Sequence, residues 1–208
     1  MEEKKLNEQE SLELIARMID QTKKESALGS GNVFLVWGYL CTFMSLSVFA
    51  MTYIRKESGW GWLYLAIPLI GFVLAGIVAR RTSRKYKTPA TYQAKSIGSV
   101  WACLSGVFAA YAVFCLFNWN EPAGWTGMFL LGMLLPGIGT YCTGVILKEW
   151  PVQVCGMIGA FTGARFLFEV CTNGAMISIK WPIVMAITMV ITLVIPGHIL
   201  NAKAKKAN

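Results

Sequence analysis

The sequence predicts an all-α polytopic membrane protein: a bundle of six transmembrane helices with a short cytoplasmic amphipathic helix at its N-terminus. Of the 208 residues, 55% are hydrophobic and only 14% are charged, and the mean hydropathy is +0.52. Soluble domains are about 25% charged. The apolar residues fall into six runs of membrane-spanning length, and the basic residues gather at the ends of those runs. Lys and Arg in such positions orient a protein in a membrane.

Residues 1–31 are expected to form a separate cytoplasmic segment. Leu12, Ile15 and Ile19 recur on one helical face, and Gly29 and Gly31 are expected to end this helix. The segment holds seven acidic and five basic residues, so it does not match the basic amphipathic helix that lies on anionic lipid. Its apolar face is expected to contact the bundle, a second copy of the chain or a soluble partner.

Six apolar runs follow, each of about 19–21 residues, which matches a hydrocarbon core of roughly 30 Å at about 1.5 Å per residue. Fifteen Lys and Arg residues belong to the side that holds both termini and the second and fourth connections, and three belong to the opposite side. The positive-inside rule therefore predicts that both termini are cytoplasmic. The runs cover about residues 33–53, 61–79, 97–117, 127–147, 152–171 and 181–199 of the 32–199 transmembrane domain, and residues 200–208 form a basic tail.

Residues 152–173 are expected to form the central helix of the bundle. They include Arg165 and Glu169, and a charge inside a span costs about 2.5–3.5 kcal/mol unless protein or water compensates it. Roughly the opposite side carries small residues, which let a neighbouring helix approach closely. Both features predict a helix that is enclosed by others. The small residues are Gly156, Gly159, Ala160, Gly163 and Ala164.

Arg165 and Glu169 are also the candidate binding residues. Ser47, Tyr111 and Thr188 are expected at the depth of Arg165 in other helices. A functional site would bind a substrate or relay a proton in a small polar cavity. A structural pair would instead stabilise one arrangement of the helices. The sequence leaves both alternatives open.

Two prolines interrupt apolar runs. Pro68 lies in the second run, and Pro136 lies at the middle of the fourth, followed by Gly137 and Gly139. Proline removes a backbone donor, and discontinuous helices near the midplane mark some transporter sites. The sequence therefore predicts a helix break at Pro136, Gly137 and Gly139, although proline is also common in ordinary membrane helices.

No motif for nucleotide, dinucleotide or hydrolase chemistry is present, so no cofactor is expected and a non-enzymatic role is favoured. The six cysteines lack C-x-x-C spacing, and His198 is the only histidine, which predicts no metal site. The net charge of +8 is distributed at the ends of the apolar runs, so no direct nucleic-acid binding is expected. An integral-membrane enzyme that acts on lipid stays open as a third hypothesis.

Three segments carry a family resemblance: EQESLELIARMIDQTKKE, the VWGY of the first span and the closing PGHILNAKAKK. Together they resemble a group of small multi-spanning inner-membrane proteins of Bacteroides-type bacteria. The resemblance implies a bacterial inner membrane. Some members of that group are encoded beside a small winged-helix transcriptional regulator, so the resemblance also implies such a regulator as a partner. It implies no activity.

Two main functional hypotheses follow. The first is a regulatory or scaffold protein in contact with membrane lipid, whose cytoplasmic helix engages a soluble partner or self-associates through Leu12, Ile15 and Ile19. The second is a small permease, whose path would be lined by the face of Arg165 and Glu169 and by the break at Pro136.

Overall fold

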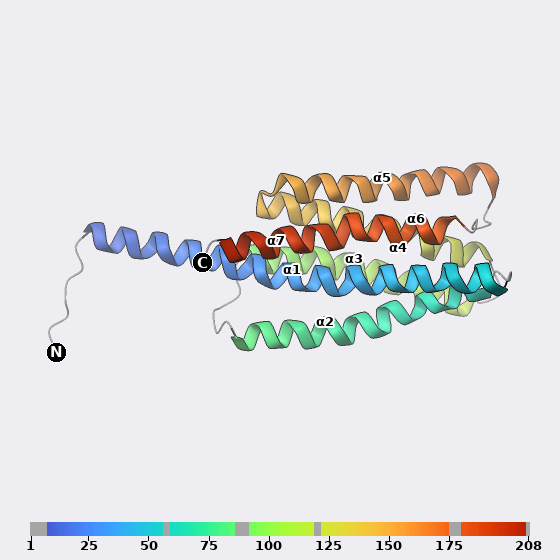
Figure 1. The fold of residues 1–208 in the computed structure, drawn as a ribbon, viewed down its shortest axis with the longest axis horizontal. Coiled ribbons are helices and arrows are strands. Elements are labelled where there is room, and N and C mark those ends of the chain that lie inside the picture. Colours follow the sequence, from blue (N-terminus) through green and yellow to red (C-terminus); the bar gives the residue numbers. More distant parts are fainter. Residues whose placement is uncertain (1–7, 56–58, 86–91, 119–121, 175–179, 207–208) are drawn as a thin grey trace.

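The computed structural model describes residues 8–55, 59–85, 92–118, 122–174 and 180–206, and each of the elements formed by these residues is helical (Figure 1). Five helices are long and apolar enough to cross a membrane, as judged by their length and composition. The predicted all-helical bundle is thereby confirmed, and the five helices indicate a membrane-embedded protein. They are Gly31–Arg55, Tyr92–Phe117, Gly124–Leu147, Trp150–Asn173 and Trp181–Lys205.

Helix α1 (Glu8–Arg55) is longer than predicted. The sequence predicts a helix end at Gly29 and Gly31, but α1 runs unbroken through both residues into the first apolar run. A glycine inside a helix costs only about 1 kcal/mol relative to alanine, which the helix on either side outweighs. Gly31 serves helix packing instead, because a Cβ at this position would overlap Asn201 of the last helix. Residues 8–30 are therefore a direct extension of the first span.

The second apolar run is divided between a 3-10 helix, η1 (Gly59–Leu65), and helix α2 (Ala66–Lys85). Its apolar helical part, Trp62–Val78, is shorter than the five long spans. Pro68 is the third residue of α2, in the first helical turn, where a missing N–H removes no α-helical hydrogen bond. Among the described residues, five helices are thus long enough to cross a membrane, where the sequence predicts six spans.

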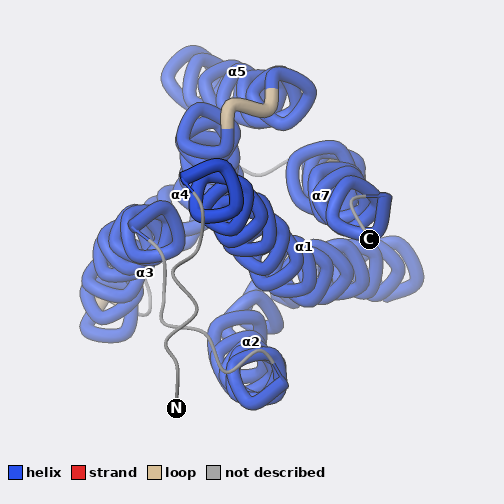
Figure 2. The backbone as a smooth tube through the Cα atoms, turned by 90° about the vertical axis from the view of Figure 1, so that its left-hand side faces the viewer, coloured by secondary structure: helices blue, strands red, loops and turns tan. Residues whose placement is uncertain are grey.

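The helices of the bundle form two groups (Figure 2). Helix α4 (Pro122–Leu147) packs between α3 (Tyr92–Phe117) and α5 (Trp150–Asn173). Helix α1 packs against α2 and against the last apolar run, which comprises α6 (Trp181–Met189), a π-helical turn, η2 (Val190–Val194), and α7 (Ile195–Lys206). The two groups meet mainly where α6 and η2 contact α4 and α5 and where α7 contacts α5.

Helix α5 lies at the edge of the bundle rather than at its centre (Figure 2). It packs mainly on α4, with smaller contacts to α6, η2 and α7. The glycine side of α5 is buried against these neighbours, whereas the other side, including Arg165, is exposed. The small residues of α5 therefore need only one close neighbouring helix, and Arg165 is not enclosed within this chain. The centre is instead filled by apolar side chains such as Met133 of α4 and Met189 of α6, both fully buried.

Helix α4 runs without a break through Pro136, so the predicted break is not present. Proline removes one helical hydrogen bond, and packing on both sides of α4 holds the helix together around this position. A Cβ at Gly137 would overlap the backbone of Ala160 in α5. A Cβ at Gly139 would lie 3.0 Å from the ring of Trp101 in α3. The two glycines thus bring α4 close to its neighbours.

Candidate functional site

The predicted pair of Arg165 and Glu169 is not an ion pair within the chain. The Glu169 carboxylate accepts a hydrogen bond from the indole N–H of Trp181 on α6, with an Nε1–Oε1 distance of 3.0 Å. Arg165 is exposed and makes no hydrogen bond or ion pair with a residue that the structure describes. Arg before Glu at i, i+4 is the less favourable order within one helix, and Trp181 supplies Glu169 with another donor.

The other predicted binding residues use their hydroxyl groups elsewhere. Ser47 donates to the carbonyl of Phe43 at 2.9 Å, and Thr188 donates to the carbonyl of Val184 at 2.7 Å, each within its own helix. The Tyr111 hydroxyl lies against Gly127 of α4. Among the described residues, no hydrogen bond joins these three side chains to Arg165 or Glu169.

The small residues of α5 lie at close helix contacts. A Cβ at Gly156 would overlap the main-chain nitrogen of Tyr141, and a Cβ at Gly163 would lie 3.0 Å from the Cα of Leu134, both in α4. Ala160 contributes its backbone to the same contact opposite Gly137. Ala164, in contrast, is exposed.

A buried polar contact joins α4 to the π-helical turn η2. Pro196 has no N–H, so it cannot donate to the carbonyl of Thr192, its partner four residues back in an α-helix. In η2 the N–H of Ile195 bonds to the carbonyl of Val190, five residues back. The hydroxyl of Thr140 donates to the freed Thr192 carbonyl at 3.0 Å, and both threonines are fully buried. The last apolar run, rather than the fourth, thus has an irregular turn near its middle, and α4 compensates the irregularity with a hydrogen bond.

At one end of the bundle, polar contacts join α1 to α7. Asn201 donates through Nδ2 to Oδ1 of Asn32 at 3.0 Å. Two turns further along α1 and one turn earlier in α7, the Tyr39 hydroxyl and Nε2 of His198 are 2.8 Å apart. We call these two pairs, Asn32–Asn201 and Tyr39–His198, the α1–α7 clamp. The clamp lies where residues 8–30 leave the bundle.

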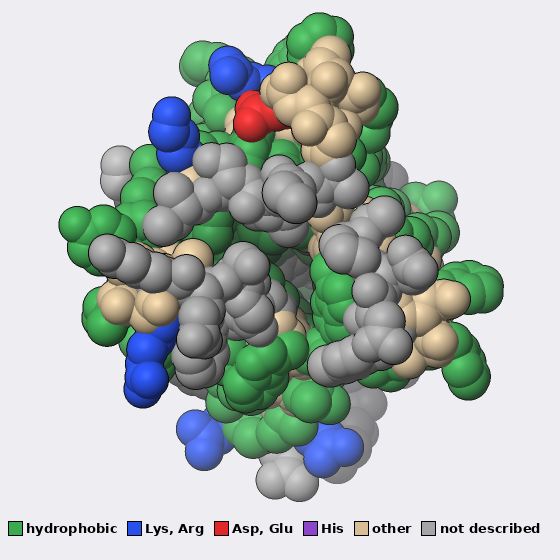
Figure 3. All heavy atoms as spheres, turned by 90° about the vertical axis from the view of Figure 1, so that its right-hand side faces the viewer, with side chains coloured by type: hydrophobic (Ala, Val, Ile, Leu, Met, Phe, Trp, Pro, Cys, Tyr) green, Lys and Arg blue, Asp and Glu red, His purple; other side chains and the backbone are tan. Residues whose placement is uncertain are grey.

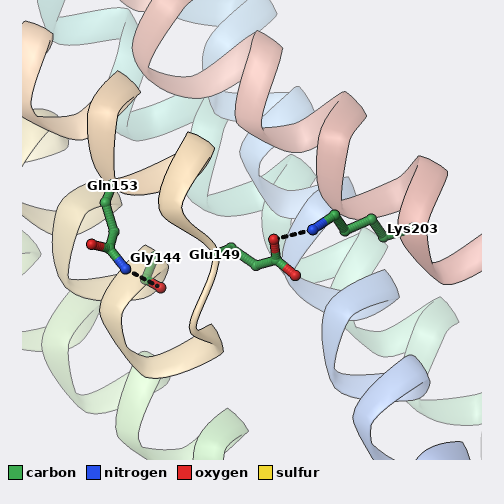
Figure 4. Close-up of polar contacts among 4 residues, drawn as sticks. All are labelled: Gly144, Glu149, Gln153 and Lys203. Carbon is green, nitrogen blue, oxygen red and sulfur yellow. Dashed lines mark hydrogen bonds and ion pairs between the residues drawn. The ribbon is translucent and has the colours of Figure 1, made fainter.

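The turn between α4 and α5 connects to α7 at the same end (Figure 4). Lys148 has a positive φ of 57°, and its N–H bonds to the carbonyl of Val145 at 3.1 Å. The N–H of Glu149 bonds to the carbonyl of Gly144 at 2.8 Å, which completes a Schellman helix ending. The Glu149 carboxylate then forms an ion pair with Lys203 of α7. At this end of the protein, α7 is therefore bound both to α1, through the clamp, and to the turn between α4 and α5.

Residues 8–30 form a helical arm that extends beyond the end of α7 (Figure 1). Leu12 and Met18 are 66% and 59% exposed, and Leu14 is also exposed. By helical periodicity Leu12 and Leu14 lie toward the two edges of the apolar face that the sequence predicts, with Met18 between them. Arg17 and Glu13 form an ion pair at 2.8 Å on the other side of the arm. Ile15 and Ile19 lie in the same helix, but their side chains are outside the described part of the structure.

Comparisons with known proteins add no family to this description. No protein-family model, no curated protein and no solved structure matches the chain.

Sequence reasoning missed the polar contacts that hold α7. His198 and Asn201 are three residues apart, and Lys203 follows two residues later. Residues three apart share a helix face, so His198 and Asn201 predict a polar face at the end of the last span. The partners of that face, in α1 and in the turn between α4 and α5, have no local signal in the sequence.

Proposed function

We propose that this protein is a six-span bacterial inner-membrane protein whose cytoplasmic arm docks a soluble regulatory protein. The arm, residues 8–30, is the observation that carries the proposal. It continues the first span as one helix, extends beyond the bundle and exposes Leu12, Leu14 and Met18. A helix with an exposed apolar face is suited to binding in a hydrophobic groove of a partner.

The length of the second apolar run supports six spans. Trp62–Val78 comprises four residues of the 3-10 helix η1 and thirteen residues of α2. At about 2.0 Å per residue in a 3-10 helix and about 1.5 Å in an α-helix, this segment extends about 28 Å. That length is close to the roughly 30 Å hydrocarbon core. The 3-10 stretch thus lets a short apolar segment cross the bilayer.

The distribution of charge supports cytoplasmic termini. Arg80, Arg81, Lys148 and Lys203 belong to the end of the bundle from which the arm emerges. The view onto the opposite end shows hydrophobic side chains over much of the described surface, with Lys and Arg groups around its edge (Figure 3). By sequence, fifteen Lys and Arg residues belong to the side with both termini and three to this side. Basic residues collect on the cytoplasmic side of inner-membrane proteins.

The α1–α7 clamp supports a regulatory role for the arm. Asn201 donates a hydrogen bond to Asn32, which lies two residues after the arm ends. Lys203 forms an ion pair with Glu149 in the turn between α4 and α5. These contacts form a continuous chain from the end of the arm through α7 to the α4–α5 turn, and we propose that partner binding at the arm acts on the bundle along it. The winged-helix regulator implied by the family resemblance is the partner that we propose for the arm.

The permease hypothesis has less support. It requires a polar path at Arg165 and a broken helix at Pro136. Arg165 is exposed on the outer side of α5, and α4 is continuous through Pro136. The docking role requires only a helical arm with exposed apolar residues, which the structure has. We therefore propose docking in preference to transport.

The proposal is tested by purification of the full-length protein in detergent with its bound regulator. Leu12→Asp places a charge on the apolar face of the arm and should abolish co-purification. Arg17→Ala, on the other face, is the matched control and should retain the regulator. Deletion of residues 1–28 should leave the thermal unfolding of the bundle unchanged. A deletion that unfolds the bundle would instead assign the arm a structural role.

A further inference from the structure

The side of α5 that faces away from α4 carries a regular exposed seam. Its residues are separated alternately by four and three positions, the spacing with which two helices pack in a left-handed supercoil. This spacing continues over the whole span. We call these exposed residues the α5 seam: Val154, Ile158, Phe161, Arg165, Phe168 and Thr172.

Arg165 distinguishes the α5 seam from an ordinary lipid-facing surface. Helix α3 also exposes apolar side chains such as Phe114, and acyl chains cover such a surface without penalty. Arg165 lies about 5 Å from the middle of its span, at about 1.5 Å per residue. A guanidinium group that faces acyl chains at this depth is unfavourable. Within the described chain it has neither a hydrogen bond nor an ion pair.

A second copy of the chain would supply the missing partner of Arg165. Oε1 of Glu169 accepts the hydrogen bond from Trp181, and a carboxylate has acceptor sites for more than one donor. Glu169 lies one turn, about 6 Å, further along α5 than Arg165. Two copies inserted in the same direction have parallel α5 helices. A two-fold axis along the membrane normal makes each seam residue face its symmetry mate. The Arg165 side chain of each copy then extends one turn along the interface to pair with Glu169 of the other copy.

We propose that the α5 seam is a dimer interface, in which two copies pack their α5 helices in parallel and form two equivalent Arg165–Glu169 ion pairs. The apolar seam residues pack on their symmetry mates above and below these pairs. The charge that α5 carries is thereby neutralised between chains rather than within one chain. This inference is independent of the docking role of the arm, which uses the other end of the polypeptide.

Disulfide crosslinking in membranes tests the position of the interface. In a background in which alanine replaces the six native cysteines, Phe161→Cys and Phe168→Cys should each convert most of the protein into a covalent dimer on oxidation. Phe114→Cys on α3 is the matched control, because Phe114 and Phe161 are 66% and 65% exposed, and it should stay monomeric. No dimer from the α5 positions, or equal dimer from Phe114→Cys, would overturn the proposal.

Charge reversal tests the ion pairs. In the Phe161→Cys background, Arg165→Glu should lower the crosslinked fraction at least fivefold, because it places acidic groups opposite each other. The double variant R165E/E169R should recover crosslinking. Unchanged crosslinking in Arg165→Glu would overturn the pairing. The wild-type mass in nanodiscs gives a test without substitutions: two chains of 23.0 kDa support the dimer, and one chain contradicts it.

Discussion

The hydroxyl of Thr140 on α4 donates a hydrogen bond to the main-chain carbonyl of Thr192 at 3.0 Å. The carbonyl is available because Pro196, four residues later, has no N–H to offer it. A buried carbonyl without a donor is costly in a membrane, where no water replaces the lost partner. The Thr140 side chain therefore supports the π-helical turn that separates α6 from α7, and it joins the two groups of helices in the bundle.

Thr140→Val should destabilise the bundle by about 1–3 kcal/mol, because valine keeps the shape of threonine but leaves the Thr192 carbonyl unpaired. Thermal unfolding in detergent measures this loss. Thr162→Val is the matched control. The Thr162 hydroxyl bonds only to the carbonyl of Ile158 in its own helix, at 2.8 Å, so its loss should be small.

The same measurement in a Pro196→Ala background separates this explanation from a simple packing effect. Alanine restores an N–H that can bond to the Thr192 carbonyl. Thr140→Val should then cost less than it does beside Pro196, and the difference is the coupling between the two positions. An equal cost in both backgrounds would contradict the role given to Thr140.

Gly156→Ala should disrupt the contact between α4 and α5. The added Cβ would overlap the main-chain nitrogen of Tyr141, and backbone atoms cannot move aside as the end of a side chain can. A loss of about 1–3 kcal/mol is expected from such overpacking. Gly106→Ala on α3 is the control, because nothing lies within 4 Å of its added Cβ. If the two variants unfold at the same temperature, the packing assigned to Gly156 is wrong.

Cysteine accessibility tests the six-span topology. Arg81 follows the second apolar run and Asn118 follows the third, and both residues are exposed. In intact cells, an impermeant maleimide should label Asn118→Cys, and it should reach Arg81→Cys only after the membrane is permeabilised. If the second run does not cross, α3 is inserted in the opposite direction and the labelling pattern is reversed.

The helical bundle could be predicted because long apolar runs specify spans with little dependence on context. The third run illustrates this: residues 97–117 are predicted, and α3 covers Tyr92–Phe117. Glycine and proline were less reliable as signals of a helix end. Gly31 and Pro136 are helix breakers by propensity, yet both lie inside continuous helices. Their local cost is small beside the packing and hydrogen bonding of the long helices that contain them.

The neighbours of each helix could not be predicted. Thr140 and Thr192 are 52 positions apart, and no periodicity relates them. The sequence suggests that Arg165 and Glu169 form a pair, because they share one helix face. Glu169 instead accepts a hydrogen bond from Trp181. A charge in a span indicates that a partner is needed without indicating where it lies. Only the arrangement of the helices shows that α5 has an outer side.

Photo-crosslinking from the arm tests the central claim most directly, namely that its apolar face binds a soluble regulator. Benzoylphenylalanine at position 18, in cells that express the full chain, should form one adduct with that regulator. The same probe at position 17, on the other face of the arm, should form none, and Leu12→Asp should remove the adduct from position 18. No protein adduct at position 18, or an adduct with the chain's own bundle, would contradict the docking role.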